Sequence, residues 1–519
     1  MDIKKLVVRS FCLGLLALPA AGVFAASTTT DKAYDLKLDT KTYAVQDIKA
    51  GNTAVTVRAF ENRVYVKNPV DKDYETMNIY VPEAYYEGKS INGYTAKTAP
   101  IFFPNTIGGY MPGAAGKPGE DFRHGGADAA LTALSRGYVV AEAGARGRTL
   151  VSVDGHFTGK APACIVDLKA AVRYLRYNKG RLPGDTEKII SDGTSAGGAM
   201  SALLGASGNS ADYEPYLKAL GAASKRDDIF AVMAYCPIAN LEHADMAYEW
   251  VFNGVNDYHQ HKMMPQGIRI GGKALPLGHG PVLTNRPANA PEEVAAAQPM
   301  SADQISASAD LKKQFPAYIN SLGLTAADGQ QLTLDATGNG SFKDYIEAIY
   351  MASSQKALDN GTDLSKLDWL TIVDGKIVAM DLAKYAAYAT RMKATPAFDA
   401  FDLSSGENDE FGDAATPGRH FTAYAQQRST KAVAMADGVI IKLMNPMAYI
   451  GEKGCTSAKH WRIRHGSVDR DTSLAIPALL ALKAQQAGYD VDFASPWGRG
   501  HDGDYDLTDL FDWADKLCK

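Results

Sequence analysis

The most informative pattern in the chain is Lys188-Ile189-Ile190-Ser191-Asp192-Gly193-Thr194-Ser195-Ala196-Gly197-Gly198-Ala199. Its apolar beginning predicts a strand, and the small residues from Ala196 onward predict a helix. Between them, Gly193-Thr194-Ser195-Ala196-Gly197 matches G-x-S-x-G, a sharp strand–turn–helix connection that exposes its serine. Glycines are needed there because side chains would clash with the neighbouring strand or helix. The stretch therefore predicts Ser195 as a nucleophile.

Short apolar runs continue on both sides of this stretch and alternate with helical patterns. Residues 34–86 are rich in β-branched and aromatic side chains and predict antiparallel strands near a sheet edge. Alternating strands and helices predict a mostly parallel, doubly wound sheet, which with the serine turn is typical of the α/β-hydrolase fold. Further strands are predicted at 99–103, 137–141, 229–234, 460–464 and 490–493, and helices at 161–178, 473–487 and 511–517.

The alternation stops after residue 243 and resumes after residue 424. The intervening segment is too long for a connecting loop, and parts such as 345–358 have a helical pattern. We therefore expect a large, mainly helical lid domain, residues 244–424, inserted between two parts of the α/β core, residues 26–243 and 425–519.

Serine nucleophiles need a base to take their proton and a carboxylate to orient that base. In this fold the chain order is serine, then acid, then histidine. Asp469 follows the predicted strand at 460–464, and His501 is the only later histidine and follows the last strand. The order predicts a triad of Ser195, Asp469 and His501, with Asp471 as a rival for the acid on these grounds alone.

Acyl transfer also needs two backbone donors for the oxyanion. One is expected at Ala196, directly after the nucleophile. The second is expected in the loop after an early strand, Asn105-Thr106-Ile107-Gly108-Gly109-Tyr110, where Gly109 is the first choice and Gly108 the second. Neither a cofactor nor a metal is expected for this chemistry.

Several blocks of the chain together resemble one family, the bacterial tannases, which are α/β hydrolases that split galloyl esters and carry a large lid. The likeness covers most of the chain after residue 25 and is weakest in the middle of the expected lid. Unlike fungal tannases and feruloyl esterases, the chain has no cysteine adjacent to the nucleophile or the base in sequence. The resemblance is carried by Pro104–Tyr110, Gly193–Gly198, Trp461–Arg464 leading into Asp469–Thr472, Met392–Asp399, and Glu407.

The resemblance implies that Ser195, Asp469 and His501 form the triad. It also implies that Lys393, Glu407 and Asp471 hold the phenolic hydroxyls of a galloyl ring, which gives Asp471 a role other than that of the acid. The expected function is hydrolysis of galloyl esters through an acyl-enzyme. The alternatives are a feruloyl or general aryl or carboxyl esterase on the same triad, an inactive exported binding protein, and a peptidase of the same fold.

The N-terminus predicts export. Residues 1–25 order two lysines, an apolar run and small residues, as a cleavable secretory signal does, so a periplasmic or extracellular protein without a membrane anchor is expected. The net charge of −5 gives no reason to expect nucleic acid, and the expected partner is a small phenolic ester.

After cleavage four cysteines remain, and they allow three pairings. A Cys455–Cys518 disulfide and simple buried thiols are equally consistent with the sequence, in which the other two are Cys164 and Cys236. The sequence does not indicate an oligomeric state.

Overall fold

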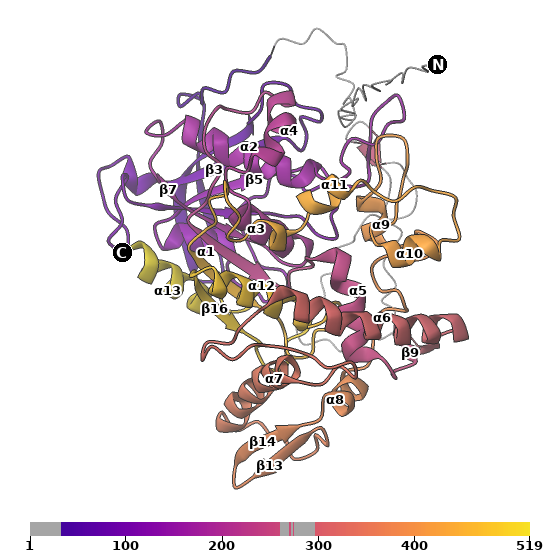
Figure 1. The fold of residues 1–519 in the computed structure, drawn as a ribbon. Helices are drawn as coiled ribbons and strands as arrows, with labels where there is room; N and C mark the ends of the chain where they lie inside the picture. The colour runs from indigo at the N-terminus through magenta and orange to yellow at the C-terminus, as the bar shows by residue number, and fades with distance from the viewer. Residues whose placement is uncertain (1–32, 260–268, 271–272, 275–295) are drawn as a thin grey trace, which may run out of the picture. The chain divides into compact units, whose positions relative to one another are not determined.

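The structure, a computed structural model, describes residues 33–259, 269–270, 273–274 and 296–519 (Figure 1). The predicted signal segment, residues 1–25, lies outside the described residues. A nine-stranded sheet has the order β1-β2-β3-β5-β4-β7-β8-β15-β16. Its strands are β1 (Ala44–Ala50), β2 (Thr53–Val64), β3 (Thr76–Pro82), β4 (Pro100–Pro104), β5 (Val139–Ala143), β7 (Asp185–Asp192), β8 (Ala231–Tyr235), β15 (His460–Arg464) and β16 (Asp490–Ala494).

The sheet changes character at β5. Strands β1, β2, β3 and β5 pair antiparallel, whereas β5, β4, β7, β8, β15 and β16 run parallel to one another. Every residue of β5 and of β8 is buried, as expected for strands that helices cover on both faces. The predicted mostly parallel, doubly wound sheet with an antiparallel edge is confirmed.

Helices join the parallel strands and pack against them. Helix α1 (Ala129–Ser135) contacts β4 and β5 and packs with α13 (Leu507–Cys518), and α2 (Ala163–Tyr177) packs with α3 (Ala196–Ala206). Helix α3 lies against β7 and β8, and α12 (Ala475–Gln486) lies against β15 and β16. Among the described residues, no helix has both the length and the apolar composition needed to span a membrane.

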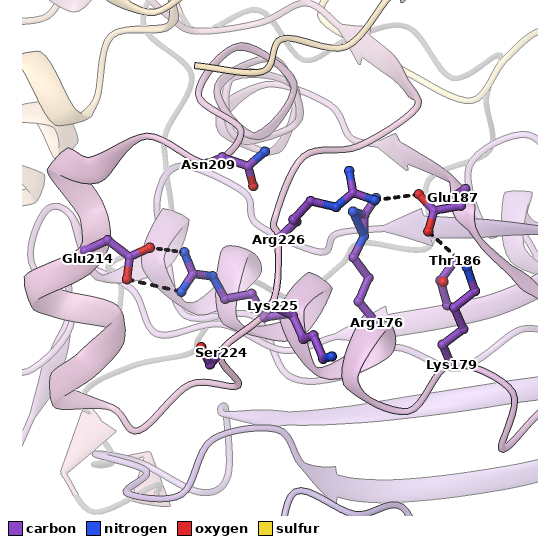
Figure 2. A pocket seen from close by; sticks show the side chains of 10 residues that line it. Arg176, Lys179, Thr186, Glu187, Asn209, Glu214, Ser224, Lys225 and Arg226 are labelled. Carbon is purple, nitrogen blue, oxygen red and sulfur yellow. Dashed lines mark hydrogen bonds and ion pairs between the residues drawn. The ribbon is translucent and has the colours of Figure 1, made fainter. Parts of the chain in front are cut away.

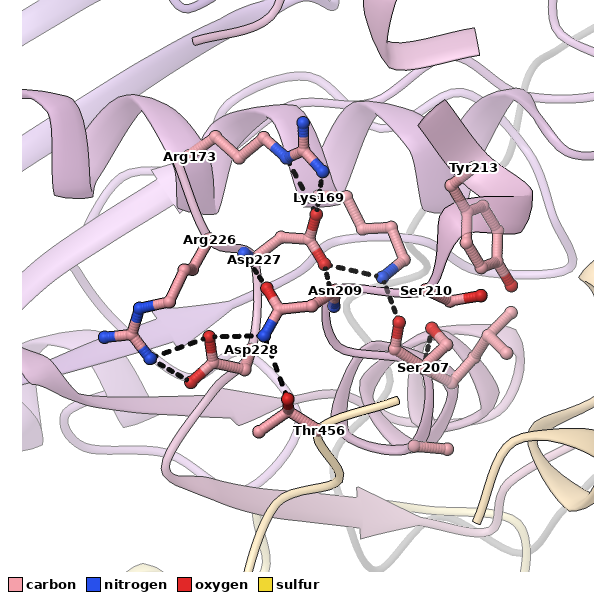
Figure 3. Close-up of polar contacts among 12 residues, drawn as sticks. Lys169, Arg173, Ser207, Asn209, Ser210, Tyr213, Arg226, Asp227, Asp228 and Thr456 are labelled. Atoms are coloured by element: carbon pink, nitrogen blue, oxygen red, sulfur yellow. Dashed lines mark hydrogen bonds and ion pairs between the residues drawn. The ribbon is translucent and has the colours of Figure 1, made fainter. Parts of the chain in front are cut away.

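Buried charges fasten α2 to the segment before β8 (Figure 3). Lys169 Nζ donates to Asp227 Oδ1 at 2.9 Å, and Arg173 Nε donates to Asp227 Oδ2 at 2.7 Å. The backbone N–H of Asn209 donates to the same carboxylate at 2.8 Å. The side chains of Lys169 and Asp227 are only 0% and 1% exposed. Buried charges of this kind are tolerated only while each has its partners, so they hold α2 in one position.

The sheet receives no described strand from the segment between β8 and β15. That segment is mainly helical, as predicted, although the limits 244–424 of a separate lid domain stay a prediction because α5 begins before them. It also forms a hairpin that was not predicted, β13 (Leu370–Val373) and β14 (Lys376–Met380). Its helices are α5 (Leu241–Phe252), α6 (Ala302–Leu322), α7 (Ser341–Asp359), α8 (Leu382–Ala389), α9 (Gly406–Glu410), α10 (Ala423–Gln427) and α11 (Gly438–Leu443).

An aromatic core joins α5 to α6 and α7 in the helical segment. The Trp250 ring lies 5.2 Å from the Phe315 ring and 5.7 Å from the Phe342 ring, measured between centroids. The remaining elements are η1 (Glu83–Tyr85), β6 (Leu150–Val151), η2 (Ala211–Tyr213), α4 (Glu214–Ala219), β9 (Asp257–Tyr258), β10 (Arg269–Ile270), β11 (Lys273–Ala274), β12 (Gln298–Pro299) and η3 (Pro446–Ala448).

The four cysteines of the described chain are free thiols. The Cys455–Cys518 disulfide, one of two readings of the sequence, is therefore wrong, and the reading as thiols is correct. The physical reason is position. Cys518 is the buried last residue of α13, whereas Cys455 is half-buried in the segment before β15, beside Ser210.

Candidate active site

Ser195 occupies the turn between β7 and α3 in a conformation that few residues adopt. Its backbone has φ +64° and ψ −125°, which costs a residue with a side chain on the order of 1–3 kcal/mol. Two hydrogen bonds compensate: the Ser195 N–H donates to the Tyr235 carbonyl at 2.9 Å, and the Ile238 N–H donates to the Ser195 carbonyl at 3.2 Å. The segment after β8 thus fixes the turn, and the half-buried Ser195 remains accessible.

The neighbouring glycines leave room for other backbone segments. A Cβ on Gly193 would lie 2.5 Å from the Gly197 carbonyl oxygen, and one on Gly198 would lie 2.4 Å from the Tyr235 carbonyl oxygen. A Cβ on Gly197 would meet the Ile107 carbonyl oxygen at 2.7 Å. The expected steric need for glycine is present, and it involves the loop after β4 as well as a strand and a helix.

Asp469 and His501 meet because they follow β15 and β16, which are adjacent parallel strands. His501 Nδ1 lies 2.9 Å from Asp469 Oδ2, and the other carboxylate oxygen accepts the Asp471 N–H at 2.8 Å. The loop that carries His501 also reaches the serine turn, because a Cβ on Gly503 would lie 1.9 Å from Thr194 Oγ1. Within the described residues, the buried Nε2 of His501 has no hydrogen-bond partner.

Neighbouring charges shift the pKa values of Asp469 and His501 in opposite directions. Burial by itself raises the pKa of Asp469, but attraction to the His501 and His465 rings outweighs it and lowers that pKa below its usual range. Burial by itself lowers the pKa of His501, but the carboxylates of Asp469 and Asp471 raise it above its usual range. These carboxylates therefore stabilise the positive charge that the His501 ring acquires when it takes a proton.

The loop expected to supply an oxyanion donor is held from two sides. Gly109 and Tyr110 have φ +53° and +57°, and the Gly109 carbonyl accepts Arg148 Nε at 2.7 Å. On the other side, Asn105 Nδ2 donates to the Asp192 carbonyl at 2.8 Å and to Ser201 Oγ at 3.0 Å. Ala196, the other expected donor, is the first residue of α3.

Arg148 also connects this loop to α9. Its Nη1 donates to Asp409 Oδ2 at 2.6 Å, while Asp409 also pairs with Lys160. Glu407, one of the residues expected to bind the substrate, lies in the same five-residue helix. One buried guanidinium thus contacts both the expected oxyanion loop and the helix of Glu407.

Lys393, Glu407 and Asp471 form a group of interacting charges. Lys393 Nζ lies 2.8 Å from Asp471 Oδ1, and both side chains are half-buried. Burial lowers the pKa of Lys393, but the carboxylates of Asp471 and Glu407 reverse this and raise it. Burial is also the main cause that raises the pKa of Glu407. The structure therefore brings these three residues together, and one of them, Asp471, lies two residues along the chain from Asp469.

Tyr248 of α5 ties this group to the Asp469 loop. Its hydroxyl donates to the Arg470 carbonyl at 2.9 Å and accepts the N–H groups of Met392 at 3.1 Å and Lys393 at 3.3 Å. Sequence reasoning missed Tyr248, and it also missed Asn105 and Arg148. Their roles come from contacts between distant segments, and an aromatic residue on a helix ordinarily indicates only a core position.

A polar surface pocket of about 570 Å³ lies elsewhere (Figure 2). It is rich in arginine and lysine, and two of its arginines form ion pairs, Arg226 with Glu187 and Arg173 with Glu214. None of the site residues predicted from the sequence lines it. The pocket is therefore not the site expected at the ends of β7, β15 and β16.

Comparisons with known proteins agree with this geometry. A family model described as BD-FAE matches residues 122–277, and no curated protein matches the chain. A tannase from Fusobacterium nucleatum is 51% identical with a TM-score of 0.86, covering 94% of this chain and 100% of its own. A tannase from Lactobacillus plantarum is 47% identical with a TM-score of 0.84, covering 93% of this chain and 100% of its own.

A third solved structure is a tannin acyl hydrolase in complex with ethyl gallate. It is 46% identical with a TM-score of 0.83, and the match covers 93% of this chain and 99% of that one. In all three comparisons the likeness extends over nearly the whole length of both chains. The chain therefore belongs to the family of bacterial tannases, which are carboxylic-ester hydrolases of the α/β-hydrolase fold.

Proposed function

We propose that this tannase hydrolyses galloyl esters through an acyl-enzyme formed on Ser195. His501 Nε2 takes the Ser195 proton as Oγ attacks the ester carbonyl, and Asp469 orients the ring and stabilises its positive charge. The backbone N–H groups of Gly109 and Ala196 bind the oxyanion. His501 then protonates the departing alcohol, and a water molecule activated by the same ring releases the free acid.

The assignment of a galloyl group as the acid part of the substrate rests on the group of Lys393, Glu407 and Asp471. Vicinal phenolic hydroxyls present several donors and acceptors in one plane, and an ammonium between two carboxylates can pair with them. A ring without those hydroxyls would enter the site without hydrogen bonds to these partly buried charged groups, so discrimination is expected to be large. Related structures with ethyl gallate and with 3,4-dihydroxybenzoate support a phenolic acyl group.

A comparison of three substrates tests the proposal. Methyl gallate is expected to give the highest kcat/KM, ahead of methyl ferulate and a simple acetate ester. Preference for ferulate or acetate by about tenfold or more would contradict the assignment of gallate. Ser195→Ala is the control for all three, because it removes the attacking oxygen and leaves the ring-binding group intact.

The second candidate is a feruloyl or general aryl esterase on the same triad. It makes a different prediction for Lys393→Met, which removes the ammonium but keeps an unbranched side chain. In a gallate-reading enzyme this variant loses kcat/KM for methyl gallate by on the order of 10²-fold or more and keeps its rate on the acetate ester. In a general esterase both rates are equal to those of the native chain. An inactive binding protein is distinguished by failure of a fluorophosphonate probe to label the native chain.

Export is a further part of the proposal. It rests on the order of basic, apolar and small residues in 1–25, so cleavage near Ala25 is expected. N-terminal sequencing of protein from the periplasm or medium of the native host tests this, and an intact Met1 in active protein would contradict it.

A further inference from the structure

Asp469, the carboxylate that contacts His501, also belongs to a cluster of three side chains of different chemistry. The Cys236 thiol, the His465 ring and the Asp469 carboxylate each offer an atom, and these atoms all lie within 4.8 Å of one another. All three residues are buried. Although no cysteine adjoins the triad in sequence, the fold places a thiol beside it.

Strand register builds this cluster. Tyr235, the last residue of β8, pairs with Arg464, the last residue of β15. The residues that follow them, Cys236 and His465, therefore lie side by side at the carboxyl edge of the sheet. The Cys236 N–H donates to the Arg464 carbonyl at 2.7 Å. Cys236 has φ +44°, a left-handed conformation that is uncommon for a residue with a side chain. Cys236 and His465 therefore have fixed positions at the sheet edge, and Asp469 joins them from the loop that follows β15.

His465 provides a second, independent observation. Its ring is completely buried, and within the described residues neither ring nitrogen has a hydrogen-bond partner. Its closest charged neighbour is Asp469, whose Oδ2 lies 3.5 Å from Nδ1. Buried imidazole nitrogens without partners are rare because their desolvation is uncompensated.

We propose that Cys236, His465 and Asp469 form an inhibitory site for a thiophilic divalent cation such as Zn²⁺ or Cd²⁺. Sulfur, imidazole nitrogen and carboxylate oxygen are the donors that such ions accept together. Binding displaces the thiol proton to solvent, and the resulting thiolate and the Asp469 carboxylate together balance the two positive charges of the ion, while the His465 ring binds as a neutral ligand. A buried site with no net charge avoids the large cost of burying an unpaired ion.

Inhibition follows from the shared carboxylate, and this step rests on the proposed role of Asp469. Asp469 Oδ2 contacts both His501 Nδ1 at 2.9 Å and His465 Nδ1 at 3.5 Å. An ion bound to this oxygen competes with the His501 N–H, and the base loses the partner that orients it. Loss of that orientation lowers kcat by on the order of 10⁴-fold in serine hydrolases. The His501 side chain is 25% exposed, so its movement opens a route to Asp469.

A titration of the purified full chain with Cd²⁺ alone tests the proposal. After reduction and removal of metal by a chelator, the ultraviolet thiolate-to-cadmium absorption band measures binding, and hydrolysis of methyl gallate measures activity. We expect the band and the loss of activity to develop together with one ion per chain, and excess chelator to reverse both. A band without loss of activity would overturn the inhibitory site.

Matched variants locate the ion. Cys236→Ser replaces sulfur by a hard oxygen and is expected to raise the Cd²⁺ concentration for half-inhibition by about 100-fold, and His465→Gln by about 10-fold or more. Cys455→Ser removes a half-buried thiol beside Ser210 and is expected to behave as the native chain. Equal sensitivity of Cys236→Ser and the native chain would contradict the proposal.

Two further measurements keep the outcomes separate. Each variant is compared with its own rate without metal, and circular dichroism shows whether it is folded; if Cys236→Ser is unfolded, His465→Gln decides. Asp469→Asn without metal tests the proposed function by itself. If that variant keeps full activity, the proposed role of Asp469 is wrong, whereas the absorption band still shows whether the ion binds at Cys236.

Discussion

The Tyr248 hydroxyl connects the backbone at Lys393 with the loop that carries Asp469 and Asp471. It donates to the Arg470 carbonyl, which lies between Asp469 and Asp471, and accepts the Lys393 N–H. We expect Tyr248→Phe to lower kcat/KM for methyl gallate by about tenfold, because the loss of these hydrogen bonds costs on the order of 1 kcal/mol and loosens the Lys393–Asp471 pair. Most of the change should appear in KM, and the rate on an acetate ester should be unaffected.

Steady-state kinetics with both esters measure this effect. Tyr424→Phe is the matched control, since its hydroxyl contacts Ala307 and Asp310 of α6 at 3.5 Å. A parallel loss on the acetate ester would mean that Tyr248 acts on the triad and not on ring recognition.

At this scale the sequence predicts residues whose order and strand ends carry information. Ser195, Asp469 and His501 follow from chain order, and the structure brings the last two into contact. Lys393 and Glu407 follow only from family resemblance, because a lysine and a glutamate in an inserted segment ordinarily indicate a solvated surface. Tyr248, Arg148, Cys236 and His465 could not be assigned, since their contacts join segments far apart in the chain.

Among the elements, α9 and the loop after β4 are coupled through Arg148. Its guanidinium contacts the Gly109 carbonyl and Asp409, and lysine cannot reproduce two such hydrogen bonds. We expect Arg148→Lys to lower kcat by roughly 10- to 100-fold on methyl gallate and on an acetate ester alike, because a displaced oxyanion donor affects any acyl group.

Steady-state kinetics on methyl gallate and on an acetate ester show whether Arg148 supports the loop after β4 or only α9. Arg428→Lys is the control, because Arg428 pairs with Asp310 on the exposed surface. If Arg148→Lys raised only the KM for methyl gallate, the guanidinium would support α9 and leave the oxyanion loop unaffected.

The predicted elements of the core agree with the structure, and the largest omission is the β13–β14 hairpin. Its turn is Asp374-Gly375, with φ +49° and +73°, and Asp-Gly between two apolar runs is a strong hairpin signal. That signal was present in the sequence. The general helical character of the inserted segment obscured it.

For the whole molecule, buried charge makes stability depend on pH. Glu142 lies in the middle of the sheet, and burial, helped by Asp128, raises its pKa to about 8. In the unfolded chain a glutamate has a pKa of about 4.3, so the folded state holds an extra proton between these two values. The free energy of unfolding therefore decreases as pH rises through this window, by on the order of a few kcal/mol in total.

We expect Glu142→Gln, which mimics the protonated side chain, to remove this contribution and to stabilise the protein above pH 8 relative to the native chain. Urea unfolding at a weakly acidic and an alkaline pH measures the difference between variant and native protein, so other buried acids cancel. Glu87→Gln, at an exposed ion pair with Lys89, is the control. An equal change in both proteins with pH would contradict the assignment.

The Asp227 network gives a second prediction at this scale. Asp227→Asn keeps the shape of the side chain and removes the charge that neutralises the buried Lys169. We expect a loss of about 3–5 kcal/mol in the free energy of unfolding, because the ammonium is left without a counter-ion. Urea unfolding checks this against Asp212→Asn, whose exposed partner is Lys442. A loss below about 1 kcal/mol would show that the network adds little.

The pairing of the cysteines cannot be decided from the sequence alone. An even number of thiols allowed a disulfide, and only the fold shows that Cys455 and Cys518 belong to different parts of the core. Pairing depends on distance in space, which spacing along the chain does not contain.

The two carboxylates at 469 and 471 have a consequence for how this enzyme can diversify. Since the Asp471 N–H bonds to Asp469 and its side chain pairs with Lys393, one short loop carries both the proposed acid of the triad and a carboxylate proposed to bind the galloyl ring. A mutation that adapts this loop to another acid disturbs the proton relay at the same time. Descendants of this enzyme should therefore explore new alcohols far more readily than new acids, with change concentrated in segments that do not touch this loop.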